Sequence, residues 1–267
     1  MALQVQIWIK SIIENLFADN SFASKSVDHS EFVNEKTVHV PNAGAAPSVV
    51  KNRTTFPAAV TTREDVDLSY DIDEFSVDPI RIPNADKVEL SYNKRESIIR
   101  GSRNKLADDI HASLIYSWIP SGVNTIFTEG AAVTAHIASA TGNRKSMTKA
   151  SVEAAQLLFD SQNIPQTGRY MLLDAYMYNQ LKNSMTNNEV VAFLAGADPE
   201  KGVIGEYAGF RFYKRGQVAK TTKAGVLKEW SAAADATDSA AGIAWQEDCV
   251  SRALGASILF DDEGNPL

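Results

Sequence analysis

The sequence has 267 residues, of which 44% are hydrophobic and 22% charged, so its composition is that of a folded globular protein and excludes general disorder. The formal net charge of −7 excludes a cationic surface over the whole molecule, which a nucleic-acid-binding domain would need. The single cysteine, Cys249, excludes an intrachain disulfide and a cysteine-rich zinc site. No basic region precedes the first apolar run, and no window approaches about 18 uncharged apolar residues. We therefore predict neither a signal peptide nor a membrane span.

The first predicted element is an amphipathic helix over residues 3–17. Helices that bind membrane surfaces usually carry several Lys or Arg residues on the polar face, and this segment has only Lys10. We therefore expect the helix to dock on protein, either its own subunit or a neighbour. Its apolar stripe consists of Ile7, Trp8, Ile12, Ile13, Leu16 and Phe17.

A long two-stranded hairpin that projects from the domain is predicted next. Residues 37–40 are strand-like, and residues 66–72 alternate between apolar and acidic side chains, which is the period of a strand. The stretch between them, 41–63, contains three prolines and little periodicity. We expect an arm with a mobile tip that reaches outside the domain, because so long a structureless stretch is unusual inside one. The basic residues of the stretch are Lys51, Arg53 and Arg63.

Residues 64–78 contain seven acidic residues and no basic one. The first acids match the start of a calcium loop, but Tyr70 stands where that loop needs glycine and Ser76 where it needs glutamate. We interpret the segment as a strand with a solvated acidic edge, with which the basic groups of a partner could pair. The acids are Glu64, Asp65, Asp67, Asp71, Asp73, Glu74 and Asp78.

The clearest helix is predicted from Asn93, an N-cap residue with Glu96 in the capping-box position, to a stop at Pro120. About 25 residues at 1.5 Å each span roughly 37 Å, which is long for a domain of this size. The predicted inward stripe is Ile99, Leu106, Ile110, Leu114 and Trp118. The first half of the helix contains five basic residues, Lys94, Arg95, Arg100, Arg103 and Lys105.

Both helices and strands are predicted after this point. A helix is predicted over 149–161 with Thr148 as its cap, and another after the capping residue Asp174. Residues 231–242 are rich in alanine and show only a weak secondary-structure pattern, which is typical of turns. Strands are predicted at 79–83, 88–92, 169–173, 210–214, 242–245 and 256–260.

No catalytic or metal-binding motif is present. None of the four histidines forms a HExxH pair, and no G-x-S-x-G elbow occurs. His111 is predicted to be a packed or surface residue, and Asp174 a helix cap. We predict no enzyme activity and no cofactor. If the chain is an enzyme after all, His111, His136 and Asp174 are the residues to consider.

The order of these parts resembles the tailed-bacteriophage major capsid proteins of the Hong Kong ninety-seven type. The likeness lies in Val38–Gly44, in Asp71–Tyr92, in Ile164–Asp174 and in Gly209–Tyr213, taken in this order and at these spacings. It covers nearly the whole chain, although each stretch alone is weak.

The resemblance implies an α+β capsid fold with four parts. Residues 1–36 would be the N-terminal arm and 37–78 the extended β-hairpin loop. Residues 79–165 and 236–267 would form the peripheral domain, with its spine helix at 93–119. Residues 166–235 would form the axial domain, whose tip meets its copies at the capsomer axes.

The resemblance also implies function and partners. The chain would self-assemble into the hexamers and pentamers of an icosahedral or prolate head enclosing double-stranded DNA, without sequence-specific binding and without a membrane. It would be made in the bacterial cytoplasm and reside in the virion, with separate scaffolding, portal and head-completion proteins. Two alternatives stay open: an encapsulin-like compartment, and a soluble α+β enzyme whose site residues meet only in space.

A shell subunit needs distributed contacts with its neighbours rather than a deep pocket. We expect the acidic segment of one subunit to pair with the basic half of the long helix of another, because the two charges are segregated along the chain. The predicted inter-subunit contact residues are Ile7, Trp8, Ile12, Arg53, Asp65, Asp67, Asp71, Asp73, Arg95, Arg100 and Arg103.

Overall fold

The computed structural model describes residues 21–34, 36–44, 48–54, 56–57, 60, 62–80, 94–120, 124–198, 200 and 202–255, and the side chains of 94–98 are not described. The predicted helix 3–17, the Asn93–Glu96 capping box and the strands at 88–92 and 256–260 lie outside this range, as does most of the run 79–83. The chain divides into two compact units. The first holds the described residues of 21–27 and 75–252, and the second those of 28–74 and 253–255.

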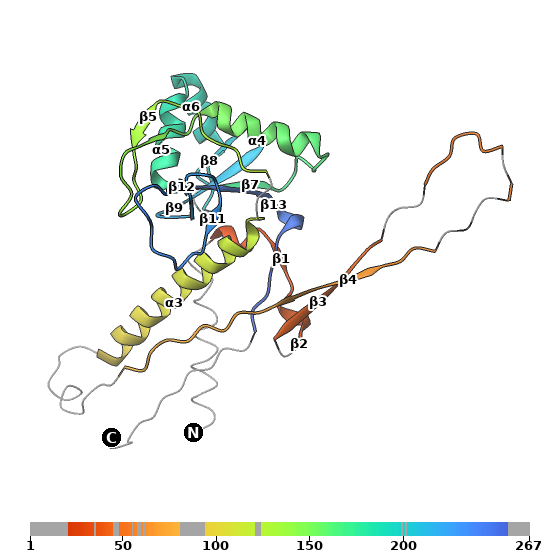
Figure 1. Cartoon of the computed structure of the whole chain (residues 1–267), viewed down its shortest axis with the longest axis horizontal. Coiled ribbons are helices and arrows are strands. Elements are labelled where there is room, and N and C mark those ends of the chain that lie inside the picture. Colours follow the sequence, from red (N-terminus) through yellow and green to blue (C-terminus); the bar gives the residue numbers. More distant parts are fainter. Residues whose placement is uncertain are drawn as a thin grey trace, which may run out of the picture. The chain divides into compact units, whose positions relative to one another are not determined.

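In the described part of the first unit, four helices accompany a four-stranded sheet, which confirms the predicted α+β class (Figure 1). The helices are α3 (Lys94–Trp118), α4 (Lys149–Ser161), α5 (Ala175–Ser184) and α6 (Asn187–Ala195), with short 3-10 turns η1 (Ser21–Ser24) and η4 (Glu247–Cys249). The sheet has the order β13 (Ile243–Gln246), β7 (Arg169–Asp174), β9 (Phe210–Arg215) and β8 (Gly205–Tyr207). β7 and β9 are parallel, and the other pairs are antiparallel.

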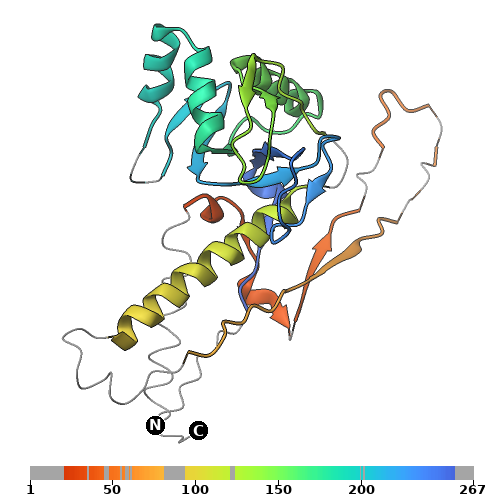
Figure 2. The ribbon, with the colours of Figure 1, turned by 60° about the vertical axis from the view of Figure 1, so that its left-hand side comes forward.

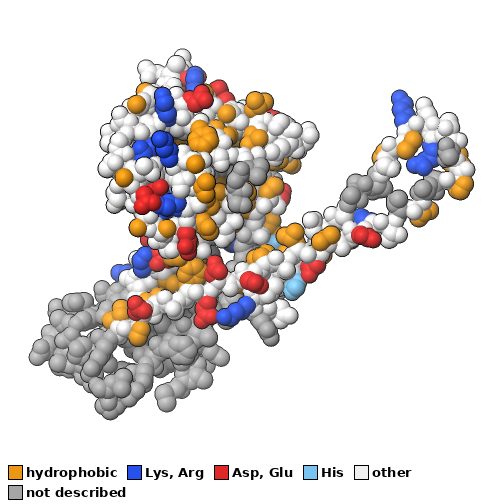
Figure 3. Space-filling model, in the orientation of Figure 1, with side chains coloured by type: hydrophobic (Ala, Val, Ile, Leu, Met, Phe, Trp, Pro, Cys, Tyr) orange, Lys and Arg blue, Asp and Glu red, His pale blue; other side chains and the backbone are white. Residues whose placement is uncertain are grey.

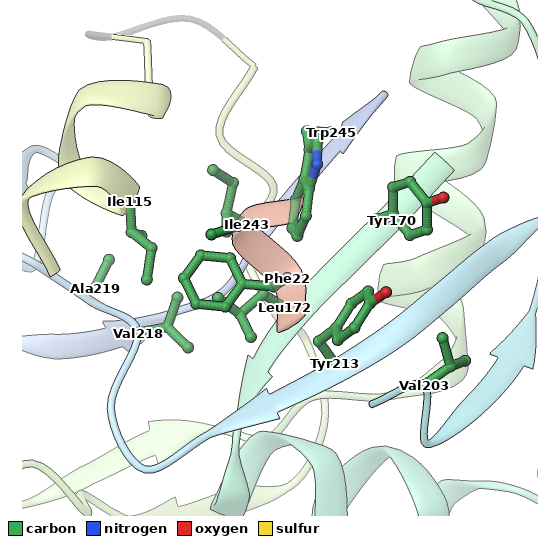
Figure 4. Close-up of a cluster of buried hydrophobic side chains, with 11 residues drawn as sticks. Phe22, Ile115, Tyr170, Leu172, Val203, Tyr213, Val218, Ala219, Ile243 and Trp245 are labelled. Atoms are coloured by element: carbon green, nitrogen blue, oxygen red, sulfur yellow. The ribbon is translucent and has the colours of Figure 1, made fainter. Parts of the chain in front are cut away.

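The central strand β7 is buried over its whole length, because both faces of the sheet are covered. On one face, Tyr170 and Leu172 pack with Trp245 of β13, Ile115 of α3 and Phe22 of η1 (Figure 4). A strand alternates its side chains between faces, so the intervening residues of β7 point to the other side.

The opposite face of the sheet is covered by α4, α5 and α6 (Figure 2). Met171 and Leu173 pack there with Phe212 of β9 and with side chains from all three helices. The helix residues that are buried in this layer are Val152, Ala155, Leu181 and Phe193. The first unit is therefore a three-layer sandwich with α3 on one side and the three shorter helices on the other.

The long helix is confirmed, but its buried stripe differs from the predicted one. The buried positions of the described part of the helix are Ala107, His111, Ser113 and Ile115, while the predicted Leu106 and Ile110 are only partly buried. The difference arises because Phe22 packs edge-on against His111, with the ring centroids 5.8 Å apart. A turn from the N-terminal segment therefore occupies this side of α3, and sequence periodicity could not anticipate it.

The N-terminal segment 21–27 is an integral part of the first unit. Phe22 and Ala23 are buried, and the indole Nε1 of Trp245 donates a hydrogen bond to the Lys25 carbonyl over 2.8 Å. Strand β1 (Val27–Asp28) begins with a hydrogen bond from the Val27 amide to the Val250 carbonyl, just before β14 (Ser251–Arg252). The chain is thus anchored here, within the segment predicted as the N-terminal arm.

Of the three predicted caps, Asn93 lies outside the described residues, Asp174 is confirmed, and Thr148 has the predicted position without the predicted hydrogen bond. Asp174 accepts a hydrogen bond from the Met177 amide over 2.6 Å and so caps α5. Thr148 stands at the N-cap position of α4, but its side chain makes no capping bond. Instead, the Lys149 amide donates to the hydroxyl of Ser184, at the end of α5, over 3.0 Å. A tertiary contact has replaced the local one.

Two smaller sheets complete the first unit. β5 (Ala132–Thr134) pairs with β6 (Asn143–Lys145), and β10 (Ala219–Thr221) lies between β11 (Leu227–Lys228) and β12 (Ser239–Ala241). The stretch 231–242, which was predicted to be turn-like, therefore contains one strand, β12. The loop before β12 is ordered by Lys228, whose ammonium contacts Asp235 at 2.6 Å and the buried Asp238 at 2.7 Å.

The second unit contains η2 (Ser30–Phe32) and a three-stranded sheet of order β2 (Val33–Asn34), β3 (Thr37–Asn42) and β4 (Val66–Asp71). β3 and β4 form the predicted antiparallel hairpin, with Thr37 opposite Asp71 and Asn42 opposite Val66. The loop 43–65 joins the two strands.

Burial of β7 predicts a large stability effect at one of its leucines. Leu172 is 1% exposed, whereas Leu157 on α4 is 70% exposed. Leu172→Ala should lower the free energy of unfolding by about 2–5 kcal/mol, because it removes buried methyl groups and leaves a cavity. Leu157→Ala is the matched control and should change it by no more than about 0.5 kcal/mol. Urea denaturation of both variants measures the difference, and equal effects would contradict this description of the core.

Candidate functional site

The hairpin of the second unit has one apolar face. Residues directly opposite each other in an antiparallel pair share a face, and the register places Val38 beside Tyr70, Val40 beside Leu68 and Asn42 beside Val66. The side chains between them, such as Asp67 and Asp71, point to the other face. The ribbon formed by β3 and β4 is therefore amphipathic.

Only the base of this apolar face is covered within the unit. Val38 is fully buried, and the Tyr70 hydroxyl lies 3.1 Å from Nδ1 of His29. Further along the ribbon, Leu68 is 54% exposed and Val66 is 61% exposed. Two-stranded ribbons are marginal in water unless a face is packed, so packing of Leu68 and Val66 against a further surface would stabilise this part of the ribbon.

The loop 43–65 also exposes large apolar side chains together with basic ones. Val49 and Val60 are almost fully exposed, and Phe56 is 75% exposed. Lys51 and the predicted contact residue Arg53 lie between them in sequence and are exposed as well. Figure 3 shows basic and apolar side chains at the end of this loop and acidic ones along the strands.

The acidic segment has partners within its own unit, which sequence reasoning missed. Asp67 contacts Nδ1 of His39 at 2.7 Å, and Asp71 accepts a hydrogen bond from the Thr37 hydroxyl over 2.8 Å. Both partners lie on β3: Thr37 is directly opposite Asp71, whereas His39 is opposite Ser69 and reaches Asp67 diagonally. The segment itself contains no base, but antiparallel pairing brings donors from about 30 residues away, a separation that only the register defines.

Two further acids are held at the ends of the ribbon. Asp65 lies 2.5 Å from Nε of Arg63 and accepts the Gly44 amide over 2.9 Å. Glu74 contacts Lys36 at 2.8 Å. These hydrogen bonds, to Arg63 and to Lys36 respectively, lower the pKa of Asp65 and the pKa of Glu74. Both carboxylates are therefore ionised acceptors that help to close the ribbon.

The other predicted contact residues are distributed over both units. Arg100 is exposed on α3, and Arg103 is half-buried on the same helix. Asp73 is exposed after β4. Ile7, Trp8, Ile12 and the side chain of Arg95 lie outside the described residues. The contacts of all these residues with other subunits stay predictions.

A second exposed apolar surface lies on α6, for which the sequence analysis predicted no element. Phe193 packs into the core, but Val191 is 70% exposed and Leu194 is 46% exposed. The helix begins at Thr186, whose amide and hydroxyl both donate to Glu189. The hydrogen bond from Lys149 and those from Thr186 lower the pKa of Glu189 to about 2. A run of six apolar residues, 190–195, is the sequence signal that could have revealed this surface.

The structure brings His136 and Asp174 together. Nε2 of His136 lies 2.8 Å from the Asp174 carboxylate, and the imidazole stacks on Tyr176 with the ring centroids 4.7 Å apart. Asp174 is the α5 cap described above, so the histidine ties the loop after β5 to the start of α5. A cavity of about 630 Å³ lies beside α3 and β10, and neither His136 nor Asp174 lines it.

His111 is buried in the core, in agreement with its predicted role as a packed residue. Its Nδ1–H donates to the Ala107 carbonyl over 2.6 Å. Across the described residues, no group of three or more His, Cys, Asp or Glu side chains is arranged to hold a metal ion. No helix in the same ranges is long and apolar enough to cross a membrane.

No protein-family profile matches the chain, and no curated protein is similar to it. Among solved structures, the chain is similar to the capsid of the cyanophage P-SCSP1u, with 17% identity and a TM-score of 0.54 over 84% of this chain and 71% of that one. It is also similar to the mature capsid of bacteriophage PhiM1, with 12% identity and a TM-score of 0.51 over 85% and 72% of the two chains. The chain thus has the fold of these phage capsid structures, as the sequence resemblance implied. The narrower Hong Kong ninety-seven assignment stays a prediction.

Burial of His111 predicts a loss of stability in mild acid. Burial is the main cause that lowers the pKa of His111 below its ordinary value of 6.5, outweighing its hydrogen bond to Ala107. The unfolded chain therefore binds this proton more readily, and the stability contributed by neutral His111 is complete above pH 6.5 and falls as the pH drops below that value. Urea denaturation at pH 7.5 and at lower pH should show this loss, and His111→Leu should reduce it. An unchanged pH dependence in the variant would contradict the prediction.

Proposed function

We propose that the chain is the structural subunit of a phage capsid. The observation that carries this proposal is the combination of a capsid-type fold and a well-packed core with exposed apolar side chains on the ribbon and on α6. Monomeric proteins rarely expose contiguous apolar surfaces, whereas subunits of assemblies do. Rings of identical subunits need heterologous contacts, in which one surface meets a different surface on the next copy.

In this proposal the subunits form hexamers and pentamers that close into an icosahedral or prolate head around double-stranded DNA. The tip of the axial domain, residues 166–235, would meet its copies at the ring axes, and α6 in this range offers an apolar face for that contact. The net charge of −7 agrees with a container that holds DNA without binding it tightly, because tight binding depends on releasing counterions from many phosphates. Scaffolding, portal and head-completion proteins would be separate chains. The subunit would act in the virion as a structural protein rather than an enzyme.

Assembly of the purified chain tests this function. Negative-stain electron microscopy with light scattering should reveal closed shells, tubes or rings of six and five. Leu68→Glu should reduce their yield severely, because it places a charge on the open face of the ribbon. Leu157→Glu, at the exposed leucine of α4, is the control and should assemble normally. A monomer or dimer that persists with added salt and crowding agent would refute the proposal.

We also propose that the acidic edge of one subunit pairs with the basic half of α3 in a neighbour. Asp71→Arg and Arg100→Asp should each reduce assembly, and the double variant should assemble better than either single one. Each exposed ion pair contributes only about 0.2–1 kcal/mol, but a shell repeats it many times. Light scattering of the three variants measures the effect. Normal assembly of both single variants would exclude this pairing.

A further inference from the structure

Beyond its first turn, helix α6 presents an outer face that is apolar and uncharged. Phe193 anchors the helix in the core, so closely that a Cβ atom on Gly205 would lie 2.4 Å from its ring. The helix contains one charged side chain, Glu189 in its first turn, and Lys149 pairs with it at 2.8 Å. Positions three and four apart share a side of a helix, and the exposed ones in the later part of α6 are all apolar. They are Val191, Ala192, Leu194 and Ala195.

A groove with the same character lies at the end of α3. It encloses about 710 Å³, and its walls are the last turn of α3, the segment 124–127 and the hairpin of β10 and β11. None of its described lining residues is charged. Phe127 and Val226 line it and are each 61% exposed. The groove therefore offers open apolar surface to a partner.

The walls of the groove are fixed by contacts within the unit. Gly225 has a φ of +80°, and a Cβ atom there would lie 2.8 Å from the ring of Phe127. The Thr222 amide donates to the Val226 carbonyl over 2.8 Å, and the Gly225 amide donates to the Thr222 carbonyl over 2.9 Å. A groove that is formed in advance loses little conformational entropy when a partner binds.

The groove cannot hold α6 of its own chain. Phe193 of α6 packs with the cluster on one face of the central sheet, whereas Ile119 and Leu227 of the groove pack against the cluster on the other face. The sheet therefore separates the two surfaces within one subunit (Figure 1). A copy of α6 that fills the groove must come from another chain.

Charge distinguishes this groove from the cavity beside α3 and β10. That cavity is lined by ionisable side chains, among them Asp108 and Arg215. An apolar helix would bury them without new partners, which costs free energy. Charge also distinguishes α6 from the exposed Leu157 of α4, because the exposed acids Glu153 and Asp160 lie one turn from that leucine. The uncharged groove and the uncharged face of α6 therefore match each other.

We infer that the groove receives α6 of a second copy of this chain, with Leu194 inserted beside Phe127 and Val226. The inference rests on the proposed function and names the partner surface of α6. A helix that lays its apolar side into a groove gains affinity from buried apolar area, through anchors spaced by three and four residues. The contact is heterologous, because the helix of one copy meets the groove of the next. Every copy offers one of each, so the contact repeats around a ring of subunits.

Disulfide crosslinking between two differently labelled chains tests the inference. Both chains carry Cys249→Ser, because Cys249 is exposed and would otherwise react. One chain carries Leu194→Cys and the other, with a size tag, Val226→Cys. Mild oxidation during assembly should give a mixed dimer on a denaturing gel, because a disulfide forms only where the two Cα atoms come within about 7 Å. Adding Val191→Glu to the first chain should abolish that dimer, because the described lining of the groove offers a carboxylate no basic partner.

In the matched control, Leu157→Cys replaces Val226→Cys and should give no mixed dimer above background, although Leu157 is the more exposed of the two. Leu157→Glu, added in place of Val191→Glu, should leave the dimer unchanged. Shells that assemble while the Leu194–Val226 dimer stays at the control level would overturn this inference and leave the proposed function intact. A disulfide between two copies of the Leu194→Cys chain, in place of the mixed dimer, would pair α6 with its own counterpart and also overturn the inference. Chains that form neither shells nor dimers would overturn both.

Discussion

Strand β7 is buried on both faces, and this constraint places nearly every other element of the first unit. A strand without a solvent-facing side needs one packing layer for its even-numbered side chains and another for its odd-numbered ones. The long helix α3 and the turn around Phe22 provide the first layer, and α4, α5 and α6 provide the second. The caps follow from the same arrangement, since Asp174 at the end of β7 begins α5 and Ser184 at the end of α5 holds the start of α4.

The ribbon of the second unit shows the opposite situation. The β3–β4 register is defined over six residue pairs and several of its acids have partners in the same unit, yet Val66 and Leu68 remain more than half exposed among the described residues of this unit. Hydrogen bonds and ion pairs at exposed positions contribute little net stability, so they fix the register of the ribbon without replacing the missing layer. A fold that completes its core in one part and leaves packing unfinished in another fits a protein whose final structure includes its neighbours.

Local signals predicted the elements that depend on local interactions. The capping residue Asp174, the apolar run of β7 and the alternation of β4 all agree with the structure. Prediction failed where a distant segment decides the outcome. Phe22 covers α3 and shifts its buried stripe, Ser184 replaces Thr148 as the partner of the α4 terminus, and the register brings His39 to Asp67. Helix α6 was missed because a short run of apolar residues has no clear periodicity, and the predicted contacts between subunits involve chains that a single sequence does not place.

The anchoring of Phe22 has a mechanical consequence. Tension applied to the chain before Ser21 would act first on Phe22, whose ring packs against His111, Trp118 and Trp245. It would not act first on a strand, whose hydrogen bonds could break one at a time. Side chains interlocked in a packed core must be extracted together, so such an attachment resists load until it yields as a unit. The side chain of Phe22 thus anchors the N-terminal segment in the core of the first unit, at the point where α3 meets the central sheet.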